Sequence, residues 1–400
     1  MKRKVITMHT IHFPRQVVYG EDSLKKVGEI ARQEGKHALL ISDPVMNELG
    51  NVAACRQLLE EAGVDVITYL GVESEPTDMY VDEALFICLE AACDLIVSIG
   101  GGSCIDTAKA VSVVMTNGGF VSDYMNQRTI AGNEGLPLIA IPTTGGTGSE
   151  VTDATVITNE ETGVKMMIKQ PAFMPKIAIV DPLLTLSTPK NTTAAVGIDS
   201  LTHALEAYIS KRAHPFTDQF ARSSFQLIME NLKDAYQDGD NITARSNTMF
   251  ASMQAGMAFS NASVCLVHGM SRPIGALFHV PHGISNAMLL PVVLEYSKHA
   301  CEERLYKLAC HVYPKLKNVS ASEGANRLVQ RILTLCEDLN IPNLGSWGID
   351  RGEFERALPK MADDALMSGS PANNPEVPTK EEIIDLYQQA YHYQYSSKTT

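Results

Sequence analysis

The 400-residue sequence lacks any uninterrupted apolar run close to the roughly 20 residues that a membrane-spanning helix needs. Its opening residues, MKRKVITMHTIHFPRQ, are basic but contain no apolar core of the kind found in secretory signals. From these two absences we expect a cytoplasmic protein that does not use a membrane as its partner.

Paired cysteine motifs are also missing. The eight cysteines are scattered without CxxC spacing, which favours reduced thiols over disulfides and argues against a Cys-type zinc site. Acidic residues outnumber basic ones, and the formal net charge of −13 disfavours nucleic acid as a partner. The negative charge does not oppose a dinucleotide, because local backbone amides rather than net charge bind such a ligand.

The hydrophobic pattern divides the chain into two parts. In the first, apolar runs alternate with amphipathic segments, a pattern typical of a parallel sheet covered on both faces. The runs expected to be strands are residues 37–43, 64–71, 93–102, 136–144 and 176–182. After about residue 186 the periodicity is almost wholly helical, and one long helix is expected over 283–312. We therefore predict an α/β domain over residues 1–186 and an all-α domain over residues 187–400.

A glycine-rich turn joins the third expected strand to a helix in SIGGGSCIDTAKA (98–110). Such a turn lets the backbone approach a pyrophosphate, and the helix N-terminus supplies free N–H groups and a positive dipole. Because the motif is neither GxGxxG nor a Walker sequence, a tight turn without a ligand is an equal alternative. A second loop, IPTTGGTGSEVT (141–152), follows the next strand, and two loops at neighbouring strand ends favour one extended ligand.

Charged residues accompany these loops. Asp43 ends the first strand, where its carboxylate can accept hydrogen bonds from an adenosine ribose and would repel a 2′-phosphate, so NAD is favoured over NADP. The alternative for Asp43 is a helix or turn cap before Pro44. For Asp106 and Lys109, in the first turns after the first glycine loop, we expect a capping role at the helix dipole.

A candidate metal site combines two segments of the second part. Asp199 and His203 lie four residues apart, about one helical turn, so they should project from the same face. His268 and His282 would complete an Asp–His₃ set without thiolate, which suits Fe²⁺ or Zn²⁺. Taken singly, each histidine is more often structural, but an unpaired charge on this apolar helix face would be costly. Glu206, one turn beyond His203, either supports that ligand or belongs to a solvated face.

Together these motifs resemble the iron-containing (group III) alcohol dehydrogenase family. The resemblance runs from FPRQVVYG (13–20) through both glycine loops, GIDSLTHALEAYI and HGMSRPIGALFHVPHG to the closing SGSPANNP, and so covers nearly the whole chain. It implies a dehydroquinate-synthase-like fold, in which an α/β dinucleotide-binding domain and an all-α metal-binding domain enclose the active site. It also implies a homodimer, with the FPRQVVYG strand as a candidate contact, or a higher homo-oligomer.

The resemblance also implies residue roles. The residues that it places at the metal are Asp199, His203, His268 and His282. Those that it places at NAD are Asp43 at the position that selects this cofactor, Gly101, Gly102 and Ser103 at the pyrophosphate, Thr143, Thr144 and Thr147 at the nicotinamide half, and Lys165 at a ribose. Those that it places in a largely apolar substrate pocket are Phe259 and Leu366.

One position departs from the family pattern. Many members carry a second histidine, implicated in proton relay, four residues after the His268 position, where this chain has Arg272. A guanidinium cannot act as a base at neutral pH. The relay then runs either through cofactor ribose hydroxyls and water or through His279, for which a capping or structural role is the alternative.

The resemblance implies an NAD(H)-dependent alcohol dehydrogenase for small primary or secondary alcohols and the matching aldehydes or ketones. A divalent metal (Fe²⁺, Zn²⁺ or another ion) would polarise the alcohol oxygen while hydride passes to the nicotinamide. A hydroxyacid–oxoacid transhydrogenase or a lyase on the same fold is an alternative, for which Arg272 could bind a substrate carboxylate or phosphate. A catalytically silent metal- or nucleotide-binding module is a third hypothesis. The sequence does not name the alcohol.

Overall fold

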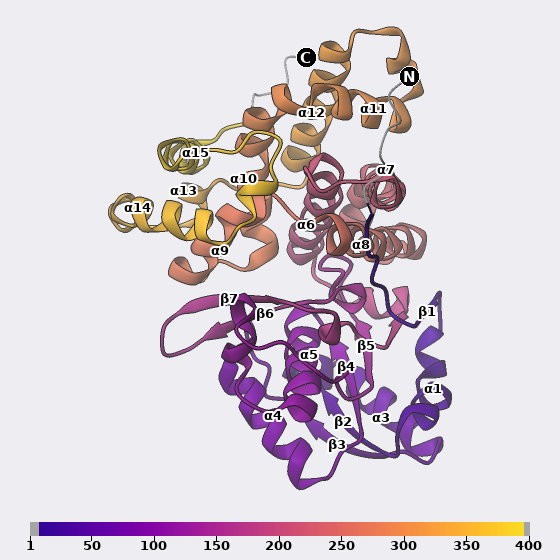
Figure 1. Ribbon diagram of the computed structural model, residues 1–400. Coiled ribbons are helices and arrows are strands. Elements are labelled where there is room, and N and C mark those ends of the chain that lie inside the picture. Colours follow the sequence, from indigo (N-terminus) through magenta and orange to yellow (C-terminus); the bar gives the residue numbers. More distant parts are fainter. Residues whose placement is uncertain (1–7, 396–400) are drawn as a thin grey trace.

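The computed structural model describes residues 8–395, with a sheet-containing part below a helical part in the view of Figure 1. Six parallel strands form the main sheet in the order β1-β8-β5-β4-β2-β3. The strands are β1 (Gln16–Tyr19), β2 (His37–Ile41), β3 (Asp65–Tyr69), β4 (Leu95–Gly100), β5 (Leu138–Pro142) and β8 (Ile177–Val180). Every predicted strand is present, and Gln16–Tyr19, within FPRQVVYG, adds an edge strand.

Helices cover both faces of this sheet, as the continuous apolar runs predicted. They are α1 (Val27–Glu34), α2 (Pro44–Glu48), α3 (Asn51–Glu61), α4 (Asp78–Glu90) and α5 (Gly102–Asn117). Side chains alternate along a strand, so Leu39 and Ile41 pack in one apolar cluster with α4 and α5, whereas Leu40 packs in another with α1 and α3. The α/β fold class of the N-terminal part is therefore confirmed.

A two-stranded antiparallel hairpin was not predicted. It consists of β6 (Ala154–Asn159) and β7 (Val164–Lys169), and its turn uses Gly163 with φ +65°, a left-handed value that suits glycine. Polar and charged residues fill much of this segment, because only one face of the hairpin packs against the domain. The short apolar alternation was therefore too weak a signal to separate these strands from a loop.

The C-terminal part is all-helical, as predicted. Its helices are α6 (Lys190–Ile209), α7 (Pro215–Gln237), α8 (Ile242–Ala262), α9 (Leu266–Phe278), α10 (His282–Ser297), α11 (Glu302–Val312), α12 (Ala321–Asp338), α13 (Leu344–Trp347), α14 (Arg351–Met367) and α15 (Lys380–His392). Every residue of α6 from Ile198 to Ile209 is buried, which makes α6 the centre of the bundle. Within the described residues, none of the helices combines the length and the apolar character that a membrane span requires.

The single helix predicted over residues 283–312 is wrong. The chain leaves α10 at Ser297, passes through a short 3₁₀ segment (Lys298–Cys301) and enters α11 at Glu302. Cys301 has φ −131° and ψ 24°, outside the helical region, yet its side chain is buried. The segment from residue 297 to 302 contains neither glycine nor proline, so the sequence carries no turn signal at the bend.

The two parts meet above the carboxyl edge of the sheet, where the loop after β5 packs on the helical bundle. A Cβ built on Gly146 would lie 2.4 Å from Val196 Cβ of α6, so only glycine allows this approach. This contact brings the second glycine loop close to the segment of α6 that carries Asp199. The division of the chain at residues 186/187 stays a prediction.

Candidate metal centre and cofactor site

Four side chains from three helices converge within the helical part. Asp199 and His203 lie one turn apart on α6, His268 lies on α9, and His282 is the first residue of α10. One ligand atom from each of the four lies within 4.8 Å of the others. Asp199 Oδ1 is 3.5 Å from His268 Nε2 and 3.9 Å from His203 Nδ1. The structure thus brings together all four residues that the sequence analysis placed at a metal.

Several of these atoms are buried without a partner. Asp199 Oδ2, His203 Nδ1 and His268 Nε2 have no hydrogen-bond partner among the residues that the structure describes. Leaving buried polar atoms unpaired is costly, and here the unpaired atoms face one another. A divalent cation among them would offset that cost, and one carboxylate with three imidazoles is a donor set that Fe²⁺ and Zn²⁺ accept. The residues therefore fit a metal ion.

Burial controls the protonation of two of these histidines. It lowers the pKa of His203 to about 3 and that of His282 to about 4, so both imidazoles are neutral and have a lone pair available near neutral pH. For His268, burial also acts to lower the pKa, but Glu206 and Asp199 outweigh it and raise the pKa to about 9. A metal competes with the proton on His268, so metal binding there releases a proton.

Glu206 lies directly behind His268. Its carboxylate accepts hydrogen bonds from His268 Nδ1 at 2.7 Å and from the backbone N–H groups of Cys265 at 2.8 Å and Val267 at 2.7 Å. Because Nδ1 donates to Glu206, Nε2 of His268 is the nitrogen that faces the cluster. Glu206 is only 2% exposed, so the solvated-face alternative is wrong and Glu206 supports His268 rather than His203.

Asn286 is a residue of the site that the sequence analysis missed. Its Nδ2 donates to Asp199 Oδ1 at 2.7 Å and lies 3.2 Å from His282 Nε2. Asn286 lies four residues after His282, so a search for polar residues one turn from each ligand would have found it.

The first glycine loop leads into the N-terminus of α5. Gly101 is the N-terminal flanking residue, and no side chain caps the helix there. A Cβ on Gly101 would meet no atom within 4 Å, so the space beside this turn is open. A Cβ on Gly102, in contrast, would come 2.8 Å from Thr147 Cγ2 of the second loop. The two loops therefore touch, and an uncapped helix end between them suits a pyrophosphate.

The other residues expected at NAD surround these loops. Asp43 accepts from Met46 N at 2.8 Å as the cap of α2, and Cys104 Sγ of α5 lies 3.4 Å from its other oxygen, Oδ2. The backbone N–H of Thr143, at the end of β5, donates to Gly100 O at 3.0 Å. Thr144 and Ser103 are partly exposed in the same two loops. The cap expected as the alternative for Asp43 is present, and it does not exclude a second role for Oδ2.

Lys165 lies farther along, on β7. Its Nζ is 3.2 Å from Glu75 Oε2, and the backbone N–H of His282 donates to Glu75 Oε1 at 3.3 Å. Glu75 lies in the loop before α4, so this carboxylate joins three segments that are distant in sequence. The sequence offered no signal for Glu75, because a single acid in a polar loop has no characteristic spacing.

Asp106 and Lys109 do not cap α5, so that expectation is wrong. Lys109 is fully buried and donates to Ser149 Oγ at 2.7 Å, Thr152 Oγ1 at 3.0 Å and Ala154 O at 2.7 Å. Asp106 accepts from Ser149 Oγ and from Val156 N at 2.8 Å. Both side chains point into the protein, because the second loop and β6 pack on α5. Their hydrogen bonds link α5, which follows the first glycine loop, to the second glycine loop and to β6.

The residues expected in the substrate pocket lie on the helical side. The ring of Phe259 (α8) stacks on His203, with 4.2 Å between centroids and 17° between planes. Leu366 is partly buried near the end of α14. His279 is exposed and ends α9 in a left-handed conformation with φ 52°. Its place directly after Phe278, the last residue of α9, matches the capping alternative, and its relay role stays a prediction.

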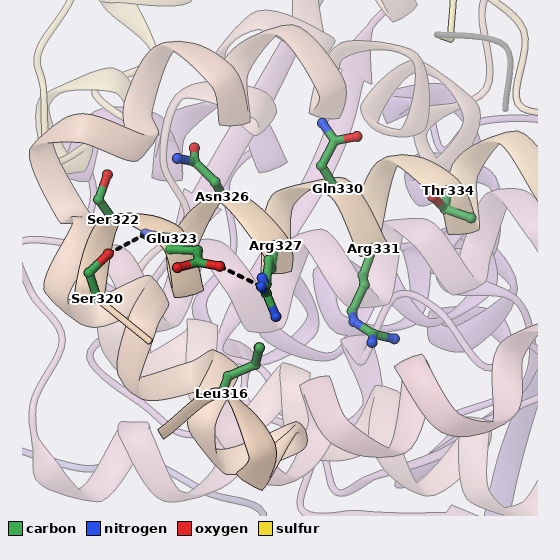
Figure 2. Close-up of a pocket in the computed structure, with 9 residues that line it drawn as sticks. All are labelled: Leu316, Ser320, Ser322, Glu323, Asn326, Arg327, Gln330, Arg331 and Thr334. Carbon is green, nitrogen blue, oxygen red and sulfur yellow. Dashed lines mark hydrogen bonds and ion pairs between the residues drawn. The ribbon is translucent and has the colours of Figure 1, made fainter. Parts of the chain in front are cut away.

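A depression on the outer surface is separate from this site. Figure 2 shows it along α12, where Glu323 pairs with Arg327 and Leu316 forms part of the opposite wall. None of the predicted site residues lines it. The buried cluster, and not this surface depression, therefore gathers the side chains suited to metal binding.

A parallel sheet with two glycine loops at its carboxyl edge, facing a buried Asp–His₃ cluster, suits an enzyme that holds a dinucleotide beside a metal ion. The family model described as iron-containing alcohol dehydrogenase matches residues 14–182, and that of the C-terminal part of the Fe-containing alcohol dehydrogenase family matches residues 193–391. The chain therefore belongs to the iron-containing alcohol dehydrogenase family, and it is an oxidoreductase that acts on CH–OH groups.

Named relatives agree with this assignment. The chain is 38% identical over 382 residues to 1,3-propanediol dehydrogenase of Citrobacter freundii, covering 94% of this chain and 97% of the relative. It is 34% identical over 384 residues to NAD-dependent methanol dehydrogenase of Bacillus methanolicus, covering 96% and 100%. The crystal structure of a 1,3-propanediol oxidoreductase superposes with a TM-score of 0.92 at 37% identity, covering 96% of this chain and 100% of that chain.

Proposed function

We propose that the protein interconverts small primary or secondary alcohols and the matching aldehydes or ketones with NAD(H), using a divalent metal held by Asp199, His203, His268 and His282. The convergence of unpartnered, buried ligand atoms in this cluster carries the proposal. Fe²⁺ is the metal that the family name implies, and Zn²⁺ or another divalent ion fits the same donors.

When bound, the metal supplies a Lewis acid that polarises the oxygen of the alcohol or carbonyl, and NAD supplies the hydride acceptor or donor. Glu206 holds the His268 ring with Nε2 toward the cluster, and Asn286 orients Asp199 by a hydrogen bond of 2.7 Å. Phe259, stacked on His203, and Leu366 provide apolar walls that keep water from the reacting carbon.

Residues 1–186 would bind NAD and residues 187–400 would bind the metal. The uncapped N-terminus of α5 supports a pyrophosphate site at Gly101, Gly102 and Ser103. Thr143, Thr144 and Thr147 would surround the nicotinamide half, and Lys165 would reach a ribose. An Asp43 oxygen directed at the first glycine loop supports NAD over NADP, because a 2′-phosphate there would be repelled.

A homodimer is the assembly that we propose. The strand β1 lies at one end of the sheet order, so one side of its backbone has no partner strand within the described chain. Such an edge is suited to pairing with a second copy. Size-exclusion chromatography with light scattering tests this assembly, and a monomer at micromolar concentration would contradict it.

The function is tested with purified protein loaded with Fe²⁺, a panel of short alcohols and the absorbance of released NADH. We expect NADH formation in the unchanged protein and a loss of several orders of magnitude in kcat/KM for His268→Ala, together with loss of bound metal. His299→Ala, at an exposed position without a ligand role, is the control. A folded, metal-depleted His268→Ala protein with full activity would contradict the proposal, whereas substrate exchange without NADH release would favour transhydrogenation.

A further inference from the structure

Arg272 is a charged residue beside the cluster to which the proposed function gives no role. It lies four residues after His268 on α9, so the two side chains leave the same face of the helix about 6 Å apart along the axis. Its partner Ser370 lies in the loop that follows α14, the helix that carries Leu366.

The guanidinium has few partners. Its Nη1 donates to Ser370 Oγ at 3.1 Å, and among residues 8–395 it forms neither another hydrogen bond nor an ion pair. The carboxylate that most affects it electrostatically is Glu206, whose oxygens already accept three N–H groups. A guanidinium carries five N–H donors, so most of those on Arg272 are free.

The free donors open onto accessible space. None of the Arg272 nitrogens is among the buried, unpartnered polar atoms of the described chain, although the atoms of the neighbouring cluster are. The side chain is partly exposed, and its surroundings lower the pKa to about 10, with burial the cause and Glu206 opposing it. Arg272 therefore stays charged at neutral pH, and its unpaired donors are not completely sealed from solvent.

Other cations near the site are already paired. Lys165 forms an ion pair with Glu75, and Lys109 uses three acceptors beneath the loops. The hydroxyl of Ser370 accepts from Arg272, so its own proton remains free to be donated to the same ligand. Arg272 and Ser370 together thus form a pair of free donors beside the metal cluster.

We propose that Arg272 and Ser370 recognise an oxyanion at the far end of the substrate, so that the preferred substrates are short hydroxyacids and the corresponding oxoacids rather than neutral alcohols. This inference rests on the proposed function and specifies its substrate class. A guanidinium matches the two oxygens of a carboxylate by two parallel hydrogen bonds. The short separation of Arg272 from His268 along α9 limits the substrate to a few carbon atoms.

The test compares kcat/KM of the metal-loaded protein for 4-hydroxybutanoate with that for 1-butanol and 1,4-butanediol, with NAD. We expect the unchanged protein to prefer the carboxylate by at least about tenfold. Arg272→Met should lower kcat/KM for 4-hydroxybutanoate by about 100-fold and change that for 1-butanol less than about threefold. Arg272→Lys should recover part of the loss, and Ser370→Ala should lie between Arg272→Met and the unchanged protein.

Sulfonate and phosphonate analogues of similar length distinguish the kinds of oxyanion. Metal content and melting temperature of each variant show whether the cluster and the fold are intact. Equal turnover of neutral and anionic substrates by the unchanged protein, or an equal loss for both in Arg272→Met, overturns the inference and leaves the proposed function standing. Absence of turnover for every alcohol, charged or neutral, overturns the proposed function and the inference with it.

Discussion

At the scale of single residues, the candidate metal centre depends on side chains that do not belong to the cluster itself. Glu206 accepts three N–H groups and determines which nitrogen of His268 faces the cluster. Asp199 and His203 were predictable because one helical turn separates them in the sequence. The contact of Asn286 with Asp199 and the contact of Glu206 with His268 were not predictable, since they depend on how α6, α9 and α10 meet.

Replacing Glu206 by Gln should weaken metal binding without removing a ligand. The amide NH₂ group of Gln would face N–H groups that now donate to the Glu206 carboxylate. The hydrogen bond that orients the His268 ring would then be lost. We expect a 10- to 100-fold decrease in metal affinity, measured by competition with a chelator of known affinity. Glu230→Gln, on the exposed face of α7, is the control, and equal metal affinities in the two variants would contradict this role.

Glu150 provides a prediction of pH dependence. It is 2% exposed in the short 3₁₀ helix Ser149–Val151, and burial raises its pKa from 4.5 to about 7 against the opposing effects of its own backbone N–H and Lys109. Because the folded-state pKa is the higher one, the folded state binds more protons between pH 4.5 and 7. The contribution of Glu150 to stability is therefore fully present below pH 4.5 and is lost as the pH rises through 7.

Glu150→Gln should remove this dependence. At pH 8 the ionised, buried carboxylate costs on the order of 3 kcal/mol, so the variant should melt a few degrees higher than the unchanged protein. At pH 5, where most of the carboxyl groups of folded Glu150 are protonated, the two melting temperatures should nearly coincide. Thermal unfolding followed by circular dichroism at both pH values measures the difference. A shift of the same size at pH 5 and pH 8 would show that titration of Glu150 is not the cause.

At the scale of elements, α5 holds the second glycine loop and the hairpin β6–β7 through Lys109 and Asp106. The sequence placed both residues after a glycine loop, but it could not show that their side chains point inward. The hairpin that receives the Lys109 hydrogen bond at Ala154 O was itself not predicted. When the sequence signal for an element such as this hairpin is weak, the sequence cannot predict the contacts that the element makes. Only the tertiary structure shows them.

Replacing Lys109 by Met should loosen this connection. Three acceptors would lose their donor, and Asp106 would lose its nearby cation while remaining buried. We expect a loss of about 3 kcal/mol in the free energy of unfolding, measured by urea denaturation, and a higher KM for NAD. Lys26→Met, which removes an exposed ion pair with Glu29, should cost less than about 1 kcal/mol. Similar losses in the two variants would contradict the proposed connection.

At the scale of the whole molecule, Glu75 joins the sheet-containing part to the helical part. It binds Lys165 of β7 and the backbone N–H at the start of α10, where His282 is located. Glu75→Ala should free Lys165 and allow the two parts to separate more readily. We expect a KM for NAD raised by about tenfold, consistent with the loss of a charge-assisted contact, and a smaller change in kcat. Steady-state kinetics with varied NAD and saturating alcohol measure both the KM for NAD and kcat.

The control for Glu75→Ala is Glu73→Ala, an exposed acid two residues earlier in the same loop. It changes the charge of the loop equally but has no role in the contact with α10. A rise in the KM for NAD in both variants would assign the effect to net charge. No rise in Glu75→Ala would show that the contact is not needed to hold the cofactor.

The sequence by itself determined that an α/β part precedes an all-helical part, and it determined the two glycine loops and the four candidate metal ligands. These features depend on periodicity and on short spacings, which can be recognised along the sequence. Only the tertiary structure decided the bend between α10 and α11, the inward direction of Lys109, and the contacts of Glu75, Asn286 and Arg272. Each of these depends on residues far apart in the chain. Their energies come from burial and pairing across elements, which no local pattern records.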